Sequence, residues 1–130
     1  MADPKTRIER DSMGELQVPM DALYGAQTQR AVNNFPISGK PMPMQFIRAL
    51  ILAKAAAARA NVELRQISES QGNAIVEASL GLLQDDFMQH FPVDIFQTGS
   101  GTSSNMNANE VIATLASRLL GEPVNPNDHV

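Results

Sequence analysis

The chain has 130 residues, of which 43% are hydrophobic and 18% are charged, a balance typical of one globular domain and unlike that of a disordered segment. The net charge of −4 at pH 7 argues against a surface for nucleic acid or for an anionic membrane, since both require clustered basic residues. The sequence has no cysteine, which excludes disulfides and thiolate-bound metals, and no apolar run near the roughly 20 residues of a membrane span, so we expect a cytoplasmic protein.

A small β-hairpin over residues 6–19 is the first predicted element. Two short runs with strand-like composition flank Gly14, and a glycine there supplies the positive φ that a tight turn requires. Two strands alone are marginally stable, so the hairpin needs the rest of the domain. After it, Asp21 is positioned to cap a short helix from about residue 22 to residue 33.

The longest predicted helix covers residues 44–64. Apolar residues recur there at steps of three and four, which predicts one buried face made of Phe46, Leu50, Ala53, Ala57, Ala60 and Leu64. A second helix is predicted to begin at Ser68, because Ser68 and Gln71 have the spacing of a capping box. The many alanines of the first helix allow a neighbouring helix to approach closely.

Residues 91–97 are expected to be a short extended segment that leads into a stretch rich in Gly, Ser and Thr. A last helix is predicted over about residues 103–120, with Gly121 in the C-terminal capping position. Its expected core face is made of Ala108, Ile112, Leu115 and Leu119. The fold class is therefore mainly α, with a small N-terminal β-hairpin.

The stretch with candidate chemistry is residues 98–110. Gly99 and Gly101 let the backbone approach a ligand closely, and the free N–H groups at the start of the following helix favour an anion. No Lys or Arg occurs between residues 98 and 117, so the donors are neutral, which suits a small carboxylate better than a nucleotide triphosphate. The alternative is a plain helix cap made by one of the Ser or Thr side chains.

Three asparagines, at positions 105, 107 and 109, lie in the first turns of this predicted helix. Asparagine is unfavourable inside a helix because its side chain competes for backbone hydrogen bonds, so we expect a separate interaction to hold each one. His90 is expected to be structural rather than catalytic. No metal site is expected, because a solvated turn explains the acidic residues that could suggest one, namely Asp85, Asp86 and Asp94.

Residues 97–113 closely resemble the first conserved block of class II fumarases. Residues 7–15 and 24–30 also resemble blocks of that family, and residues 125–130 are similar to its His/Asn-Pro-Asn-Asp element. The resemblance covers nearly the whole chain. It implies that residues 1–130 are the N-terminal domain of a member of the fumarase/aspartase superfamily, truncated before the central helical bundle.

The resemblance implies a fumarate hydratase, which adds water reversibly to fumarate to give L-malate in the tricarboxylic acid cycle. The family works without a metal or other cofactor, as a homotetramer whose active sites draw residues from three subunits. Ser100, Gly101 and Thr102 match the family residues that contact a substrate carboxylate. The family's catalytic serine loop and active-site histidine have no counterpart here, so no catalytic residue is assigned and this stretch is expected to be inactive alone.

The resemblance also implies a second, shallower dicarboxylate site, matched here by Asn125, Pro126, Asn127 and Asp128. Fumarases commonly have His at the position of Asn125. The alternative for these residues is an Asn-Pro turn followed by an Asx-type cap at Asn127 or Asp128.

Two other functions stay open at this point. Aspartate ammonia-lyases often carry Asn-Pro-Asn-Asp-His-Val, as residues 125–130 do. They usually read Gly-Gly-Ala-Gly-Thr, however, where this chain reads Thr-Gly-Ser-Gly-Thr over residues 98–102. A relative that binds dicarboxylates without turning them over is the other alternative.

Overall fold

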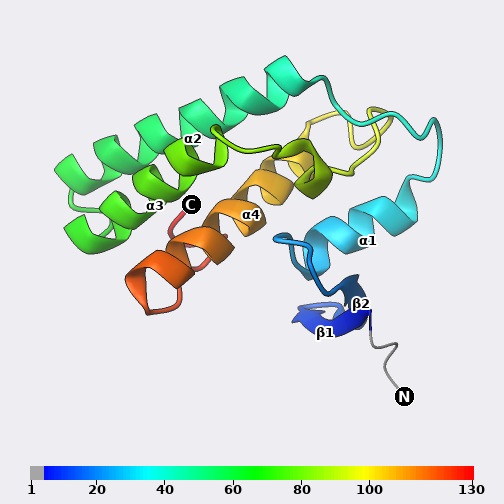
Figure 1. Cartoon of the computed structure of the whole chain (residues 1–130), viewed down its shortest axis with the longest axis horizontal. Coiled ribbons are helices and arrows are strands. Elements are labelled where there is room, and N and C mark those ends of the chain that lie inside the picture. Colours follow the sequence, from blue (N-terminus) through cyan, green and yellow to red (C-terminus); the bar gives the residue numbers. More distant parts are fainter. Residues whose placement is uncertain (1–4) are drawn as a thin grey trace.

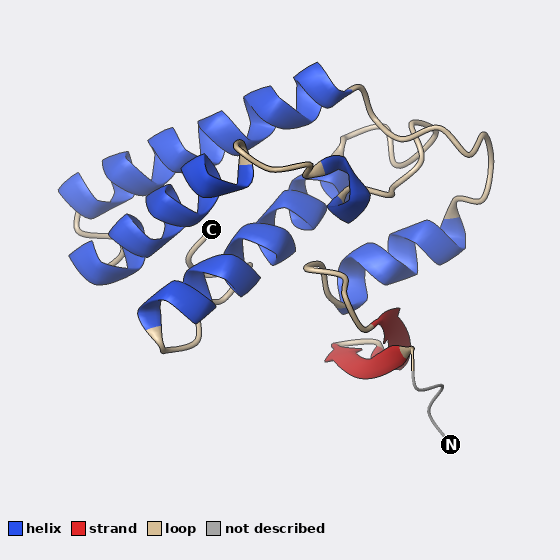
Figure 2. Cartoon of the chain, viewed as in Figure 1, coloured by secondary structure: helices blue, strands red, loops and turns tan. Residues whose placement is uncertain are grey.

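The computed structural model describes residues 5–130. Its elements, in chain order, are β1 (Thr6–Asp11), β2 (Gly14–Pro19), α1 (Ala26–Asn34), α2 (Met44–Glu63), α3 (Glu69–Leu82), the short 3-10 helix η1 (Met88–His90) and α4 (Thr102–Leu120). The mainly helical fold class with a small N-terminal hairpin is confirmed (Figure 2). In the part of the chain that the structure describes, no helix has both the length and the hydropathy that a bilayer span requires.

Helix α4 runs through the middle of the domain. Helix α3 packs against both α2 and α4, while α1 packs against α4 and against the hairpin (Figure 1). Residues of α4 are among the most deeply buried of the core, and Val111 and Ile112 are fully buried. The segment before α4 is therefore attached to a helix that is deeply buried in the core.

The hairpin is fixed to the rest of the domain by two arginines. Gly14 pairs with Asp11 and has a φ of +121°, so the predicted positive φ at this glycine is confirmed. The Arg7 guanidinium donates to the Tyr24 carbonyl at 2.8 Å. Arg30 of α1 donates to Asp11 at 2.7 Å, and this hydrogen bond holds the pKa of the Asp11 carboxyl below its usual value.

Helix α1 begins at Ala26, later than predicted, and the predicted cap by Asp21 is wrong. The first amides of α1 bond instead to Glu110, a buried carboxylate on α4. Glu110 accepts from the amide of Thr28 at 2.7 Å and from the amide of Gln27 at 3.2 Å. A carboxylate at this position satisfies free N–H groups and faces the positive end of the helix dipole.

Helix α3 begins where the capping box predicts. The Ser68 hydroxyl accepts from the Gln71 amide at 3.1 Å, and the Gln71 side chain accepts from the Ser68 amide at 3.2 Å. Helices α2 and α3 approach closely at Gly72, where an added Cβ would clash with a methyl carbon of Val62. The close approach is therefore made possible by a glycine of α3 as well as by the alanines of α2.

The predicted buried face of α2 is wrong. The buried residues are Ile47, Ile51, Ala55 and Ala58. Phe46 and Leu64, which were expected to be buried, are 44% and 67% exposed. Helix α2 carries apolar residues on more than one side, so the spacing alone does not tell which stripe faces the neighbouring helix.

The last predicted helix is confirmed as α4. Gly121 ends it with a φ of +75°, the left-handed conformation expected of a C-terminal glycine. The predicted core face is right at Ala108 and Ile112 but wrong at Leu119, which is 53% exposed. Residues 91–97 do not form a strand, although Asp94 makes an isolated bridge with Pro41.

Candidate functional site

The glycine-containing loop before α4 forms a tight turn. The Gly101 amide donates to the Thr98 carbonyl at 3.0 Å, and Gly101 has a φ of +75°, a conformation that a glycine adopts without strain. Gly101 is itself the residue that precedes α4, and no side chain caps the helix there. The alternative of a simple Ser or Thr cap is therefore not what the structure contains.

Gln97 takes over part of the role of a cap. Its side-chain oxygen accepts from the Ser104 amide at 2.9 Å and from the Ser104 hydroxyl at 3.0 Å. Within residues 5–130, no acceptor bonds to the amides of Thr102 and Ser103, which precede Ser104 in the first turn. Two free N–H groups at the positive end of a helix dipole are a suitable site for an anion.

Asp94 anchors the chain just upstream of the loop. Its carboxylate accepts from the amides of Ser38, Gly39 and Phe96, each at 2.8 Å. Burial raises the pKa of the Asp94 carboxyl, but these hydrogen bonds and that of the Ser38 hydroxyl outweigh burial and lower the pKa to about 2. Asp94 is thus a fully bonded structural carboxylate and not the solvated turn residue that was predicted. Residues 5–130 contain no group of three or more acidic or His side chains arranged to hold a metal ion.

The predicted substrate-binding residues lie together at the surface. Ser100 and Thr102 are exposed, and their hydroxyl oxygens are 2.9 Å apart. Gly101 lies between them in the chain, so its backbone is next to both hydroxyls. The loop therefore exposes two hydroxyls, which are hydrogen-bonded to each other, next to the free amides of the first helical turn, and all of these groups are neutral.

The three asparagines of α4 differ in their surroundings. Asn107 is buried and donates to the His90 carbonyl at 2.8 Å, as expected of an asparagine held by a separate contact. Asn109 is buried as well, but its side-chain oxygen has no partner among the described residues. The His90 ring accepts from the Leu23 amide at 3.3 Å, and burial lowers the pKa of this ring. His90 therefore links the segment before α1 to α4, in agreement with a structural role.

The second predicted site forms a self-contained turn. The Asn125 side-chain oxygen accepts from the amides of Asn127 (2.7 Å) and Asp128 (3.1 Å), and the Asn125 amide donates to the ring of His129 at 2.8 Å. An Asx interaction is present, but its acceptor is Asn125 and not, as was predicted, Asn127 or Asp128. After α4 the chain turns back along this helix, since Pro126 lines a small hollow together with Glu110 and Ala113 of α4. Among the described residues, no hydrogen bond joins this turn to residues 98–102.

The sequence profile of a family described as lyase matches residues 14–130. The chain belongs to this lyase family. It is 77% identical over 125 residues to fumarate hydratase class II 2 of Pseudomonas aeruginosa, in a match that covers 96% of this chain and 27% of that protein. It is 61% identical over 124 residues to the class II fumarate hydratase of Xylella fastidiosa, which covers 95% of this chain and 26% of that protein.

The fold of this lyase chain is also that of a solved fumarase. Recombinant class II fumarase from Schistosoma mansoni matches with a TM-score of 0.90 at 40% identity, over 95% of this chain and 28% of that one. The resemblance to class II fumarases is thereby confirmed. The lyase chain spans about a quarter of the length of these relatives.

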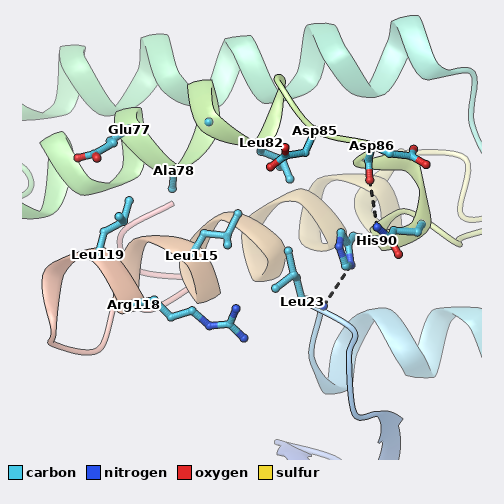
Figure 3. A pocket seen from close by; sticks show the side chains of 12 residues that line it. Leu23, Glu77, Ala78, Leu82, Asp85, Asp86, His90, Leu115, Arg118 and Leu119 are labelled. Atoms are coloured by element: carbon cyan, nitrogen blue, oxygen red, sulfur yellow. Dashed lines mark hydrogen bonds between the residues drawn. The ribbon is translucent and has the colours of Figure 1, made fainter.

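A separate cavity of about 530 Å³ lies between α3 and α4 of the lyase chain (Figure 3). Leucine side chains line it together with three carboxylates, those of Glu77, Asp85 and Asp86, and a single arginine, Arg118. Three negative charges against one positive charge give this lining a net charge of −2, with His90 neutral. Such a cavity repels a dicarboxylate, so the loop with its neutral donors is the better candidate for the carboxylate site.

Proposed function

We propose that residues 1–130 are the first domain of a longer class II fumarate hydratase, which hydrates fumarate reversibly to L-malate in the tricarboxylic acid cycle. The observation that carries this proposal is the 77% identity to a class II fumarate hydratase over 96% of the chain. The match covers 27% of that relative, which supports a domain that is one part of a larger subunit.

In this proposal, Ser100, Gly101 and Thr102 bind one carboxylate of the substrate. When a base removes the proton next to a carboxylate, negative charge builds up on that carboxylate, and fixed donors aimed at it lower the barrier. The paired hydroxyls of Ser100 and Thr102 and the free amides at the start of α4 support this role. None of the described residues is assigned as the base.

We also propose that the full-length protein forms a homotetramer, as the resemblance to class II fumarases implies. An apolar groove of about 320 Å³ on the outer side of α2 and α3 supports further packing against this domain; its lining includes Leu52, Ala56, Val76 and Leu80. Exposed apolar surface of this kind is typical of interfaces. The cytoplasmic location stays a prediction.

The second dicarboxylate site, at Asn125, Pro126, Asn127 and Asp128, also stays a prediction. The two amides that could hold a carboxylate there already donate to the Asn125 side chain. A ligand would have to displace that side chain. The bonds thus support a plain turn more than a ready anion site.

The full-length protein tests the reaction. L-malate and L-aspartate are supplied separately at equal concentration, and fumarate formation is followed by its ultraviolet absorbance. We expect kcat/KM to favour malate by a factor on the order of 10⁴, because a site built for one leaving group leaves its polar groups unpaired with the other. A kcat/KM for aspartate equal to that for malate or above it would identify an aspartase, and turnover of neither would identify a non-catalytic relative.

The isolated 130-residue chain tests the domain assignment. We expect no detectable hydratase activity from it, because the proposed domain supplies donors for one carboxylate but no base, and loss of part of a catalytic unit removes nearly all of its activity. Turnover by the isolated chain within about tenfold of the full-length enzyme would show that the assignment is wrong.

A further inference from the structure

We propose that Gln97 is a positioning residue for the carboxylate loop. Its side chain is bonded on both sides of that loop: it donates to the Asp94 carbonyl upstream at 2.9 Å and accepts from the Ser104 amide downstream at 2.9 Å. This inference depends on the proposed function of the loop, and it adds a residue that does not itself contact the substrate.

The upstream side of this connection is fixed independently of Gln97. Asp94 bonds through its carboxylate to the amides of Ser38 and Gly39. The Ile95 amide donates to the Lys40 carbonyl at 2.9 Å. The segment before Gln97 is therefore held against the segment around residue 40 by several hydrogen bonds.

The downstream side is the first turn of α4, which is anchored in the core of the domain. Ser104 is buried, and both its amide and its hydroxyl donate to the Gln97 oxygen. Gln97 thus closes residues 98–103 into a ring between two rigid supports. The same bonds engage Ser104 and leave the amides of Thr102 and Ser103 without an acceptor.

A loop with two glycines requires such a constraint if it is to hold donors in fixed positions. Glycine has the greatest backbone freedom of all residues, so residues 98–101 lose much entropy when they adopt one conformation. Donors that are already in place stabilise developing charge without reorganisation. We therefore expect Gln97 to affect the reaction by fixing the positions of the Ser100 and Thr102 hydroxyls.

Gln97→Met in the full-length enzyme tests the inference, because it keeps the side-chain length and removes both bonding atoms. The matched control is Gln89→Met. Gln89 donates to the carbonyl of Asp86 at 3.2 Å, also three residues upstream, but it bonds to no part of the loop. We expect Gln97→Met to lower kcat/KM for malate by about 10- to 100-fold per folded enzyme, since misplacement of about 1 Å can have effects of that size. Gln89→Met should stay within about twofold of the parent.

Melting curves separate positioning from folding. If kcat/KM per folded enzyme is equal in the two variants, the inference is wrong. It is also wrong if the loss in Gln97→Met disappears after correction for unfolded protein. A malate KM that rises while kcat stays constant would assign Gln97 to substrate binding alone, and would overturn its proposed action on the chemical step.

Hydrogen exchange of the Ser104 amide gives a readout that does not depend on the reaction. We expect Gln97→Met to speed this exchange by about fivefold or more, since a net hydrogen bond corresponds to a factor of that order. Gln97→Glu keeps an acceptor and should keep the amide protected. If the full-length protein turns over neither malate nor aspartate, the proposed function fails, while the exchange rates still decide the role of Gln97. Equal exchange in Gln97→Met and the parent would overturn that role.

Discussion

Replacement of Glu110 by Gln is expected to destabilise the domain although the shape of the side chain is unchanged. One carboxylate oxygen of Glu110 accepts from the Thr28 amide at 2.7 Å and from its hydroxyl, and the other accepts from the Gln27 amide at 3.2 Å. A glutamine has one oxygen and one NH2 group. If its oxygen stays with Thr28, the NH2 group points at the Gln27 amide, and two donors face each other.

The size of this effect follows from the bonds that change. One hydrogen bond to a charged group is lost, and the others change from charged to neutral, which together cost about 2–4 kcal/mol. A small domain has about 5–15 kcal/mol of stability in total. A loss of this size should lower the melting temperature of a 130-residue domain by roughly 10 °C.

Thermal and urea unfolding of the chain, followed by circular dichroism, measure the loss. Glu77→Gln is the control, because it makes the same chemical change at an exposed residue of α3, at the edge of the cavity between α3 and α4. Exposed substitutions of this kind stay within about 0.5 kcal/mol. Equal melting temperatures for the two variants would refute the assignment of Glu110 as the cap of α1.

Four further substitutions test the loop, the contact between α2 and α3, and Asp94. Thr102→Val should lower kcat/KM of the full-length enzyme by about 10² to 10³. Its melting temperature should stay within about 2 °C of the parent, because the Thr102 side chain does not cap α4. A loss of stability with unchanged kcat/KM would contradict this prediction. Gly72→Ala should destabilise the chain by about 1–2 kcal/mol, because the new Cβ would clash with Val62. Gly81→Ala should stabilise the chain by up to about 1 kcal/mol, because no atom lies within 4 Å of its new Cβ. Urea midpoints of the two variants that move in the same direction would contradict these two predictions. Because the pKa of Asp94 is lowered in the folded state, ionised Asp94 stabilises the fold fully above its unfolded pKa of about 4, and this stabilisation is lost as pH falls through the folded pKa of about 2. The difference in melting temperature between the parent and Asp94→Asn should therefore narrow from pH 5 to pH 2. A difference that stays constant with pH would contradict this prediction.

Local signals in the sequence predicted the elements whose ends depend on neighbouring residues. The capping box places the start of α3 at Ser68, and Gly121 ends α4 in the left-handed conformation. The start of α1 could not be predicted in this way. It depends on Glu110, which is 82 positions away from Thr28, and no periodicity or cap motif records a contact between residues so far apart.

The candidate site was predictable in outline but not in its support. Two glycines and several hydroxyl residues before a helix indicate an anion-facing loop, and the structure has exposed hydroxyls and an uncapped helix start there. Gln97 lies at the start of the block that resembles class II fumarases, residues 97–113, but its residue type alone did not indicate a bond to Ser104. Asp94 was likewise expected in a solvated turn, because the sequence does not reveal that Ser38 and Gly39 pack beside it.

The charge of the loop is compatible with its proposed role as one half of a dicarboxylate site. A dicarboxylate has two negative charges, yet the loop has only hydroxyl and amide donors and no Lys or Arg between residues 98 and 117. Neutral donors bind one carboxylate by hydrogen bonds of moderate strength. These bonds can still become stronger when negative charge builds up on the carboxylate in the transition state. In this proposal the second carboxylate and the proton to be removed need other groups. The turn at Asn125 is a poor source of them, because its amides already donate to the Asn125 side chain. In the proposed enzyme, this domain would therefore contribute a set of neutral donors for one carboxylate, and the base would come from outside the described residues.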